Sequence, residues 1–246
     1  MSEEKTKKVV SPAKALFDKF VFAFYIIALI SAVCFSSFVW FQKTYFVNYW
    51  VNGQSMWPTL NSETRTAKGV LFNEISMSMD GATGVDFVIG DYHKNIMDKI
   101  GRFDIVVCKY NDDDYFDKIK RVIALPGETF YIQSTGKSNE NNGDLYILNK
   151  NTQEFELITQ PIATQYIVVG DYPMTYTEPT TLGDDEYFVM GDNRAHSSDS
   201  RQNGPVKKDN LEAKAIALVA RCKTVIKQGS SSLQPVDVNY MWPRFF

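Results

Sequence analysis

The feature that most constrains this chain is an uncharged apolar segment close to its N-terminus. Residues 20–42 contain no Asp, Glu, Lys or Arg, and Phe, Ile, Ala, Val and Leu dominate them. About 20 apolar residues are enough for a helix to cross a bilayer. Large aromatic residues, which favour the membrane–water interface, lie at the end of the segment and after it: Trp40, Tyr45, Tyr49 and Trp50. We therefore predict one N-terminal transmembrane helix.

The charges on either side of this segment predict its orientation. Five lysines precede it, whereas only Lys43 follows it closely. Positive charge favours the cytoplasmic side, so we expect a cytoplasmic N-terminus and an extracytoplasmic remainder, in a single-pass protein of the cell membrane. A cleaved signal peptide is the alternative. Its apolar part is usually only about 7–15 residues long, and residues 39–43 (VWFQK) lack the small residues that cleavage requires.

The net charge and the His and Cys content of the chain argue against two classes of function, nucleic-acid binding and metal binding. The chain has 246 residues and a net charge of -3, which gives no reason to expect nucleic-acid binding. It contains two His and three Cys without a C-x-x-C spacing, so we predict no metal site and no cofactor. Whether Cys108 and Cys222 form a disulfide in the outward-facing part is left open by the sequence.

After the anchor, the pattern favours antiparallel β structure. Apolar runs at 102–110 and 118–125 flank the acidic turn 111–114, which is typical of a hairpin. Residues 129–186 alternate apolar and polar side chains and read as a smaller inserted β region. Further strands are expected at 85–89 and 187–190, and residues 211–226 form either a strand pair or a short helix.

The predicted fold is therefore mainly β: an antiparallel catalytic sheet with a smaller β insertion, preceded by one transmembrane helix. We divide the chain into a cytoplasmic tail (1–19), an anchor (20–42), a core (43–128 and 187–226), the insertion (129–186) and a C-terminal tail (227–246).

Two residues of the predicted core carry candidate chemistry. Ser55 lies in a Gly- and Pro-containing turn, GQSMWPTL, and Lys120 lies within the apolar strand KIKRVIAL. A serine hydroxyl needs a neighbouring base to become a good nucleophile. A lysine can be that base when burial removes its charge near neutral pH. Strand alternation would place Val122 and Ala124 on the same face as Lys120. A lone lysine is otherwise more often a surface residue of an edge strand.

Four separated segments resemble type I signal peptidases, in the bacterial, Gram-positive-like form. Residues 55–60 (SMWPTL) are similar to the nucleophile motif of that family, and residues 120–127 (KRVIALPG) to its general-base motif. Residues 101–107 are similar to its intervening strand motif, and residues 191–201 (GDNRAHSSDSR) to its C-terminal motif. The resemblance covers the anchor and most of residues 51–221, but it is weak at 61–100 and 129–186.

The resemblance implies a Ser/Lys endopeptidase that cleaves signal peptides after Ala-x-Ala-like sites. Its partners would be exported preproteins and the lipid bilayer, and contact with the secretion machinery is left open. Ser197 would hold the Lys120 amine, Asp199 and Arg201 would form a supporting ion pair, and Asp192 and Arg194 would form another. Met56 and Trp57 beside the nucleophile would line a substrate pocket.

The oxyanion site departs from part of the family. Some members carry a hydroxyl residue two positions before the nucleophile, where this chain has Gly53. The donors must therefore be mainly backbone N–H groups, of which that of Ser55 is the first candidate. Which side chain, if any, replaces the missing hydroxyl donor is left open by the sequence.

Alternatives remain at this point. A triad of Ser55, His196 and Asp199 is conceivable, because triads are recognised by geometry and not by sequence order. Two further alternatives are a signal-peptidase-like protease that processes only pilin or surface-fibre precursors and a non-proteolytic assembly scaffold. A scaffold would not need both Ser55 and Lys120.

Overall fold

The structure is a computed structural model, and it describes residues 11–51, 53, 55–61, 83–110, 117–134, 143–160, 176–194, 197–226 and 233–246. The chain divides into two compact units, residues 1–45 and residues 46–246. Each unit is described by itself.

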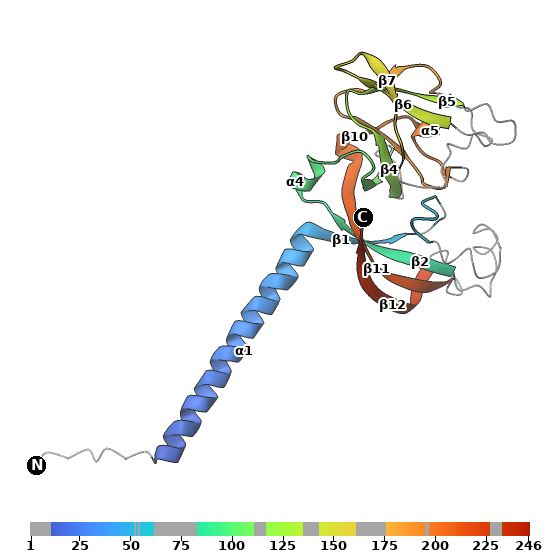
Figure 1. The fold of residues 1–246 in the computed structure, drawn as a ribbon. Coiled ribbons are helices and arrows are strands. Elements are labelled where there is room, and N and C mark those ends of the chain that lie inside the picture. The colour runs from blue at the N-terminus through green and yellow to red at the C-terminus, as the bar shows by residue number, and fades with distance from the viewer. Residues whose placement is uncertain are drawn as a thin grey trace, which may run out of the picture. The chain divides into compact units, whose positions relative to one another are not determined.

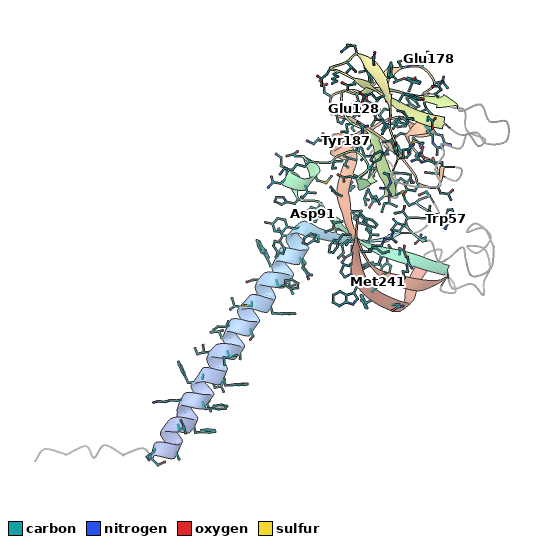
Figure 2. The ribbon with its side chains drawn as sticks, in the orientation of Figure 1. Trp57, Asp91, Glu128, Glu178, Tyr187 and Met241 are labelled. Atoms are coloured by element: carbon teal, nitrogen blue, oxygen red, sulfur yellow. The ribbon has the colours of Figure 1, made fainter. Side chains whose placement is uncertain are left out.

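The first unit is one long helix, α1, which runs from Pro12 to Tyr45. Its best window has a mean hydropathy of 2.3, and by length and composition it is able to cross a membrane. Its side chains project on all sides and are mostly exposed, as Figure 2 shows. The charge-free part, residues 20–42, spans about 34 Å at 1.5 Å per residue. The helix is therefore longer than the predicted anchor at both ends and is compatible with membrane anchoring.

The second unit is built on an eight-stranded antiparallel sheet (Figure 1). Its order is β1-β2-β11-β3-β4-β9-β10, and β12 also pairs with β11. The strands are β1 (Phe46–Val51), β2 (Thr83–Asp91), β3 (Ile105–Cys108), β4 (Lys118–Ala124), β9 (Glu186–Met190), β10 (Val206–Lys207), β11 (Leu211–Ile226) and β12 (Leu233–Phe245). The short helical elements are α4 (Lys94–Met97), α5 (Ser200–Asn203) and the 3-10 turn η2 (Lys208–Asn210).

Strand β11 corrects one prediction and explains how the sheet extends. Residues 211–226 form neither a strand pair nor a helix, but one strand of 16 residues. Its residues 214–224 pair with β2, while its other edge pairs first with β3 and then with β12. A single strand thus connects two parts of the sheet, which local apolar patterning cannot reveal.

The C-terminal segment, which we expected to be a tail, is also part of the sheet. Residues 233–245 form β12 and pair with β11 from Ile226↔Leu233 to Ala217↔Phe245. Its aromatic side chains include Tyr240 and Trp242, both of which are exposed. The aromatic composition was visible in the sequence, but the pairing partner was not.

The smaller sheet has the order β7-β6-β5-β8 and is antiparallel throughout. Its strands are β5 (Thr129–Ser134), β6 (Gly143–Asn149), β7 (Glu154–Leu157) and β8 (Thr180–Thr181). All four lie within the segment that the alternating pattern marked as an insertion. Phe130 and Ile132 of this sheet pack in one apolar cluster with Ile123 of β4 and Phe188 of β9.

A β-bulge in β4 corrects the predicted side-chain parity. The register with β9 shifts between Val122 and Ala124, so Ile123 is the extra residue. Beyond a bulge, alternation is displaced by one position. Val122 accordingly packs with Val106 and Cys108, whereas Ile123 and Ala124 pack in the cluster beneath the smaller sheet. Ala124 is therefore not on the Lys120 face.

The register also bears on the cysteines. Cys108 is paired with Leu211 at the start of β11, and Cys222 lies eleven positions further along the same strand. A strand rises about 3.3 Å per residue, whereas a disulfide needs Cα atoms within about 7 Å. This arrangement places Cys108 and Cys222 too far apart for a disulfide.

Candidate active site

Ser55 begins a turn that follows β1 and is anchored by its own apolar side chains. Met56 and Leu60 are buried in a cluster with Val51, and the Leu60 N–H donates to the Met56 carbonyl at 2.9 Å. The Ser55 carbonyl accepts a hydrogen bond from the Asn193 N–H at 2.9 Å. The nucleophile candidate is thus held by the core below it and by the segment after β9.

Lys120 lies in the middle of β4, where it is paired with Val106 of β3. Its side chain is only 3% exposed. Its Nζ lies 3.0 Å from the Ser55 Oγ and 2.9 Å from the Ile119 carbonyl oxygen. Burial lowers the pKa of Lys120, although the nearby negative charges of Asp199 and Asp192 act in the opposite direction. The fold therefore brings Ser55 and Lys120, which are 65 positions apart, into contact and shields the Lys120 amine from water.

Asp199 and Arg201 form a buried ion pair, as expected. The two Asp199 oxygens lie 2.8 Å from Arg201 Nε and 2.8 Å from Arg201 Nη2. Asp199 also caps α5 and accepts a hydrogen bond from the Gly191 N–H at 3.0 Å. The guanidinium engages both oxygens and so holds the Asp199 carboxylate in place. The Gly191 contact, together with the Val189 N–H that donates to the Ser200 hydroxyl at 3.0 Å, ties α5 to the end of β9.

Asp192 is paired with a different residue from the one that we predicted. Its carboxylate binds Arg121 through two contacts, 2.8 Å to Nε and 2.7 Å to Nη2, and it accepts a hydrogen bond from the Thr59 hydroxyl. The reason is strand alternation, since Arg121 directly follows Lys120 and points to the other face of β4. This ion pair joins β4, the Ser55 turn and the segment after β9.

Arg194 is fully buried but makes no ion pair with Asp192. Its Nε donates to the Gly191 carbonyl at 2.9 Å, and its Nη2 donates to the Gln160 side-chain oxygen at 2.5 Å. Burial lowers the pKa of Arg194 to about 10. The predicted Asp192–Arg194 pair is therefore replaced by contacts to a backbone carbonyl and to an amide of the loop after β7.

Ser197 is buried beside the site, but it does not make the predicted contact with Lys120. Within the described part of the chain its Oγ has no hydrogen-bond partner. It packs against Gly191, where an added Cβ would meet the Ser197 side chain and, at 2.5 Å, the Ser55 carbonyl oxygen. Glycine at 191 therefore allows three segments to approach one another behind Ser55.

Comparison with known proteins matches residues 19–220 to a family described as signal peptidase, peptidase S26. The chain belongs to this family. Signal peptidase I V of Bacillus subtilis is 31% identical over 172 residues, which are 69% of this chain and 83% of the relative. A signal peptidase I of Bacillus amyloliquefaciens is 31% identical over 81% of this chain and 82% of its own length.

More distant relatives carry the same description. Signal peptidase IB of Staphylococcus aureus is 28% identical over 68% of this chain and 73% of its own length. A solved signal peptidase I of Enterococcus faecalis is 26% identical, with a TM-score of 0.33, and covers 47% of this chain and 96% of that one. Membership of the S26 family implies a peptidase whose substrates carry signal peptides, and the resemblance found in the motifs is thereby confirmed.

The backbone before the nucleophile suits an S26 peptidase that lacks a hydroxyl donor there. Gly53 has φ +121°, a conformation that L side chains rarely adopt, and a Cβ there would meet no atom within 4 Å. Among the described residues, no hydrogen bond from the Ser55 N–H is found. This N–H stays our predicted oxyanion donor.

The predicted pocket residues Met56 and Trp57 differ in their exposure, and the alternative triad is only partly within the described residues. Met56 is almost completely buried in the core, whereas Trp57 is partly exposed, so a shared pocket-lining role stays a prediction. His196 lies outside the described residues. Both oxygens of Asp199, the third member of the alternative triad, are engaged by Arg201, and one also by Gly191.

Sequence reasoning missed the polar residues that hold the Ser55 turn in this S26-family chain. Arg121 and Thr59 bind Asp192, and Asn61 contacts Asp86, which also binds Arg221. Arg121 could have been found from strand parity next to Lys120. The other contacts join residues up to 135 positions apart, for which a single sequence has no signal.

Proposed function

We propose that this chain is a membrane-anchored endopeptidase that releases exported proteins from their signal peptides after Ala-x-Ala-like sites. Ser55 is the nucleophile and Lys120 the general base. The observation that carries the proposal is the 3.0 Å separation between Ser55 Oγ and a buried amine whose pKa is lowered by burial. Family membership supplies the class of substrate.

The reaction begins with the neutral Lys120 amine. It accepts the Ser55 proton as the hydroxyl attacks the scissile carbonyl, and the Ser55 N–H stabilises the resulting oxyanion. The protonated amine then returns a proton to the leaving amine, which leaves an acyl-enzyme on Ser55. The mature protein departs with this amine, so the acyl group on Ser55 is the signal peptide. Lys120 next takes a proton from water as the hydroxide attacks the ester, and it returns that proton to Ser55 Oγ as the signal peptide is released.

Protein groups around the dyad would act on its geometry. Arg121 with Asp192, and Arg201 with Asp199, fix the segments that carry Lys120 and Ser197. These carboxylates also oppose the lowering of the Lys120 pKa, but each is engaged by a guanidinium. Pairing with arginine therefore lets acidic residues lie near Lys120 without forming an ion pair with it.

Helix α1 would place the active site next to its substrate. Signal peptides are themselves embedded in the membrane, so tethering both partners to one bilayer raises their effective concentration. The substrate would bind in an extended conformation along a strand edge, where main-chain hydrogen bonds give affinity and small pockets give specificity. Preproteins and lipid are the expected partners.

Incubation of the detergent-solubilised full chain with a preprotein, followed by N-terminal sequencing of the product, tests the proposal. The native chain should release the mature N-terminus, while Ser55→Ala and Lys120→Ala should abolish release in folded protein. His196→Ala is the matched control and should cleave at nearly the native rate. Retained cleavage by Lys120→Ala would refute the dyad, and a loss in His196→Ala as large as in Ser55→Ala would favour a triad.

The same assay separates the alternative functions. A preprotein panel that includes pilin or surface-fibre precursors should be cleaved broadly by a general signal peptidase. Cleavage restricted to fibre precursors would indicate a dedicated protease. A native chain that binds such precursors and cleaves none would indicate an assembly scaffold.

A further inference from the structure

Asn61 closes the turn that begins at Ser55, and four hydrogen bonds join it to the backbone before Ser55 and to Asp86. It is buried, with 2% of its surface exposed. Its side-chain amide donates to the carbonyls of Val51 and Gly53, both at 2.8 Å. These carbonyls lie four and two positions before Ser55. One amide group therefore binds both Val51, at the end of β1, and Gly53, two residues before Ser55.

The other polar groups of Asn61 bind Asp86 of β2. The Asn61 N–H donates to Asp86 Oδ2 at 2.7 Å, and the Asp86 N–H donates to Asn61 Oδ1 at 2.7 Å. The remaining oxygen, Asp86 Oδ1, lies 3.0 Å from Arg221 Nε. Val51, Asp86 and Arg221 are also register partners across β1, β2 and β11. The turn is thus fastened to three adjacent strands of the larger sheet.

Asparagine suits this position for two physical reasons. The backbone at Asn61 has φ +57°, in the left-handed region that Asn tolerates better than most residues. Its side chain supplies an acceptor and two donor hydrogens at once. An aspartate of the same shape has no donor for the Val51 and Gly53 carbonyls. Alanine would leave buried backbone groups without partners, which is costly.

The contacts surround the nucleophile from two sides. Asn61 holds the carbonyls of Val51 and Gly53, whereas the Asn193 N–H holds the carbonyl of Ser55 itself. Neither contact involves Lys120. Asn61 therefore acts on the position of the Ser55 hydroxyl and N–H, while the strand pairing of β4 acts on the amine.

We propose that Asn61, held by Asp86 and Arg221, is a positioning residue that sets the Ser55 hydroxyl and its backbone N–H for acyl transfer. The inference rests on the proposed Ser55 nucleophile. A displacement of about 1 Å at a reacting group can lower a rate by about 100-fold. Loss of the amide grip should therefore reduce kcat and leave the recognition of the substrate unchanged.

Asn61→Asp is the first test, because it keeps the shape of the side chain and replaces the donor group with a carboxylate oxygen. Asn149→Asp is the matched control, since Asn149 lies in the smaller sheet, accepts turn hydrogen bonds and donates from its amide to Glu156 at 2.6 Å, so that its substitution also replaces an amide donor. With a preprotein substrate, we expect kcat of Asn61→Asp to fall about 100-fold and KM to change less than about threefold. In Asn61→Gly, which adds no charge, the pH midpoint of the acidic limb set by Lys120 should be unchanged.

A second variant covers the case in which a buried carboxylate next to Asp86 prevents folding. Asn61→Gly adopts a positive φ without strain and also lacks the amide. For each variant, kcat is expressed per folded molecule, measured by circular dichroism and thermal unfolding. Asn149→Asp should keep kcat within about twofold.

The outcomes are distinct. A kcat within threefold of native in either folded variant, or a loss that only follows the folded fraction, overturns the positioning role. The same holds if KM rises while kcat is kept. If instead Ser55→Ala or Lys120→Ala still cleaves the preprotein, the proposed function itself fails, whatever the Asn61 variants do.

Discussion

The two sheets of the second unit differ in what they bury. Within the described residues, the buried polar and charged side chains, such as Asn61, Lys120 and Asp199, all belong to the larger sheet or its loops. In the described part of the smaller sheet, the buried side chains are all apolar, among them Phe130, Ile132 and Leu145. The larger sheet is thus built around a site, and the smaller one around apolar contacts.

This difference indicates that the larger sheet carries the candidate site, while the smaller sheet contributes mainly to stability. A buried amine that must stay neutral opposes folding near neutral pH, and buried ion pairs recover little net stability. Apolar burial contributes about 25 cal/mol per Å² without such opposition. The smaller sheet adds Phe130 and its neighbours to the cluster that contains Ile123 and Ala124, on the strand that carries Lys120. The apolar contacts of the smaller sheet therefore offset part of the free energy that burial of Lys120 costs on the neighbouring strand.

The largest expected effect comes from removing the costly group itself. Lys120→Met should lower the rate of preprotein cleavage by about 10⁴-fold, because no base remains for Ser55. The same variant should unfold at a higher temperature than the native chain at pH 7. Burial lowers the folded-state pKa of Lys120, so the unfolded state binds more protons and protonation favours unfolding.

Thermal unfolding in a single detergent, followed by circular dichroism, measures the second part. A Tm equal to or below that of the native chain at pH 7 would contradict the claim that the Lys120 amine costs stability. Measurement near pH 11 is the control, because the amine is neutral in both states there and the difference should shrink.

Gly191→Ala should have the next largest effect. The added methyl group would meet the Ser197 side chain and the Ser55 carbonyl oxygen, so the nucleophile turn must shift. We expect kcat to fall about 100-fold and the free energy of unfolding to fall by about 1–3 kcal/mol. Gly101→Ala is the matched control, since the nearest atom to its Cβ is 3.8 Å away. Equal kcat values for the two variants would sink this prediction.

The next effect is the change of kcat/KM with pH, which should be about tenfold per pH unit and should arise from Lys120 in the larger sheet. Activity requires a neutral Lys120, so kcat/KM should rise about tenfold per pH unit and then level above the Lys120 pKa. Because burial lowers that pKa, the limb should lie below the range of an ordinary lysine, about 10.4. A limb near 10.4, or none attributable to a base, would show that the amine is not held neutral. Rates with a short peptide substrate across a buffer series supply the measurement.

The smallest effect on activity is expected in the smaller sheet. Phe130→Leu should lower the free energy of unfolding by about 1 kcal/mol, because a buried aromatic ring is replaced by a smaller group. The kcat per folded molecule should stay within about twofold. Urea titration and the cleavage assay together check both parts. A large fall in kcat with unchanged stability would mean that the smaller sheet does more than support β4.

Local sequence patterns were sufficient for the long elements, and they supplied the two candidate catalytic residues. The uncharged run 20–42 predicted the helix, and alternation predicted the smaller sheet at 129–186. Ser55 and Lys120 were singled out as a pair, and because their segments resemble two motifs of type I signal peptidases; a lone lysine in a strand would be read as a surface residue. Elements that depend mainly on residues close to them in the chain can therefore be predicted from the sequence.

The failures came from pairings across the chain. The bulge at Ile123 moved Ala124 off the Lys120 face, and residues 233–245 became a strand because β11 offered an edge. Asp192 was matched to Arg194, two positions away, but Arg121 reaches it from another strand with better geometry. Residue type alone does not say which of several cations a buried carboxylate will meet.

The amino-acid sequence by itself determined that this chain carries an apolar helix, antiparallel strands, a candidate hydroxyl and a candidate amine. Only the tertiary structure decided that the amine is dry and 3.0 Å from the hydroxyl, and which side chains hold the two in place. The reason is that desolvation and hydrogen-bond geometry depend on neighbours in space. Those neighbours come from β3, β4, β9 and β11, whose order in the sheet does not follow their order in the chain.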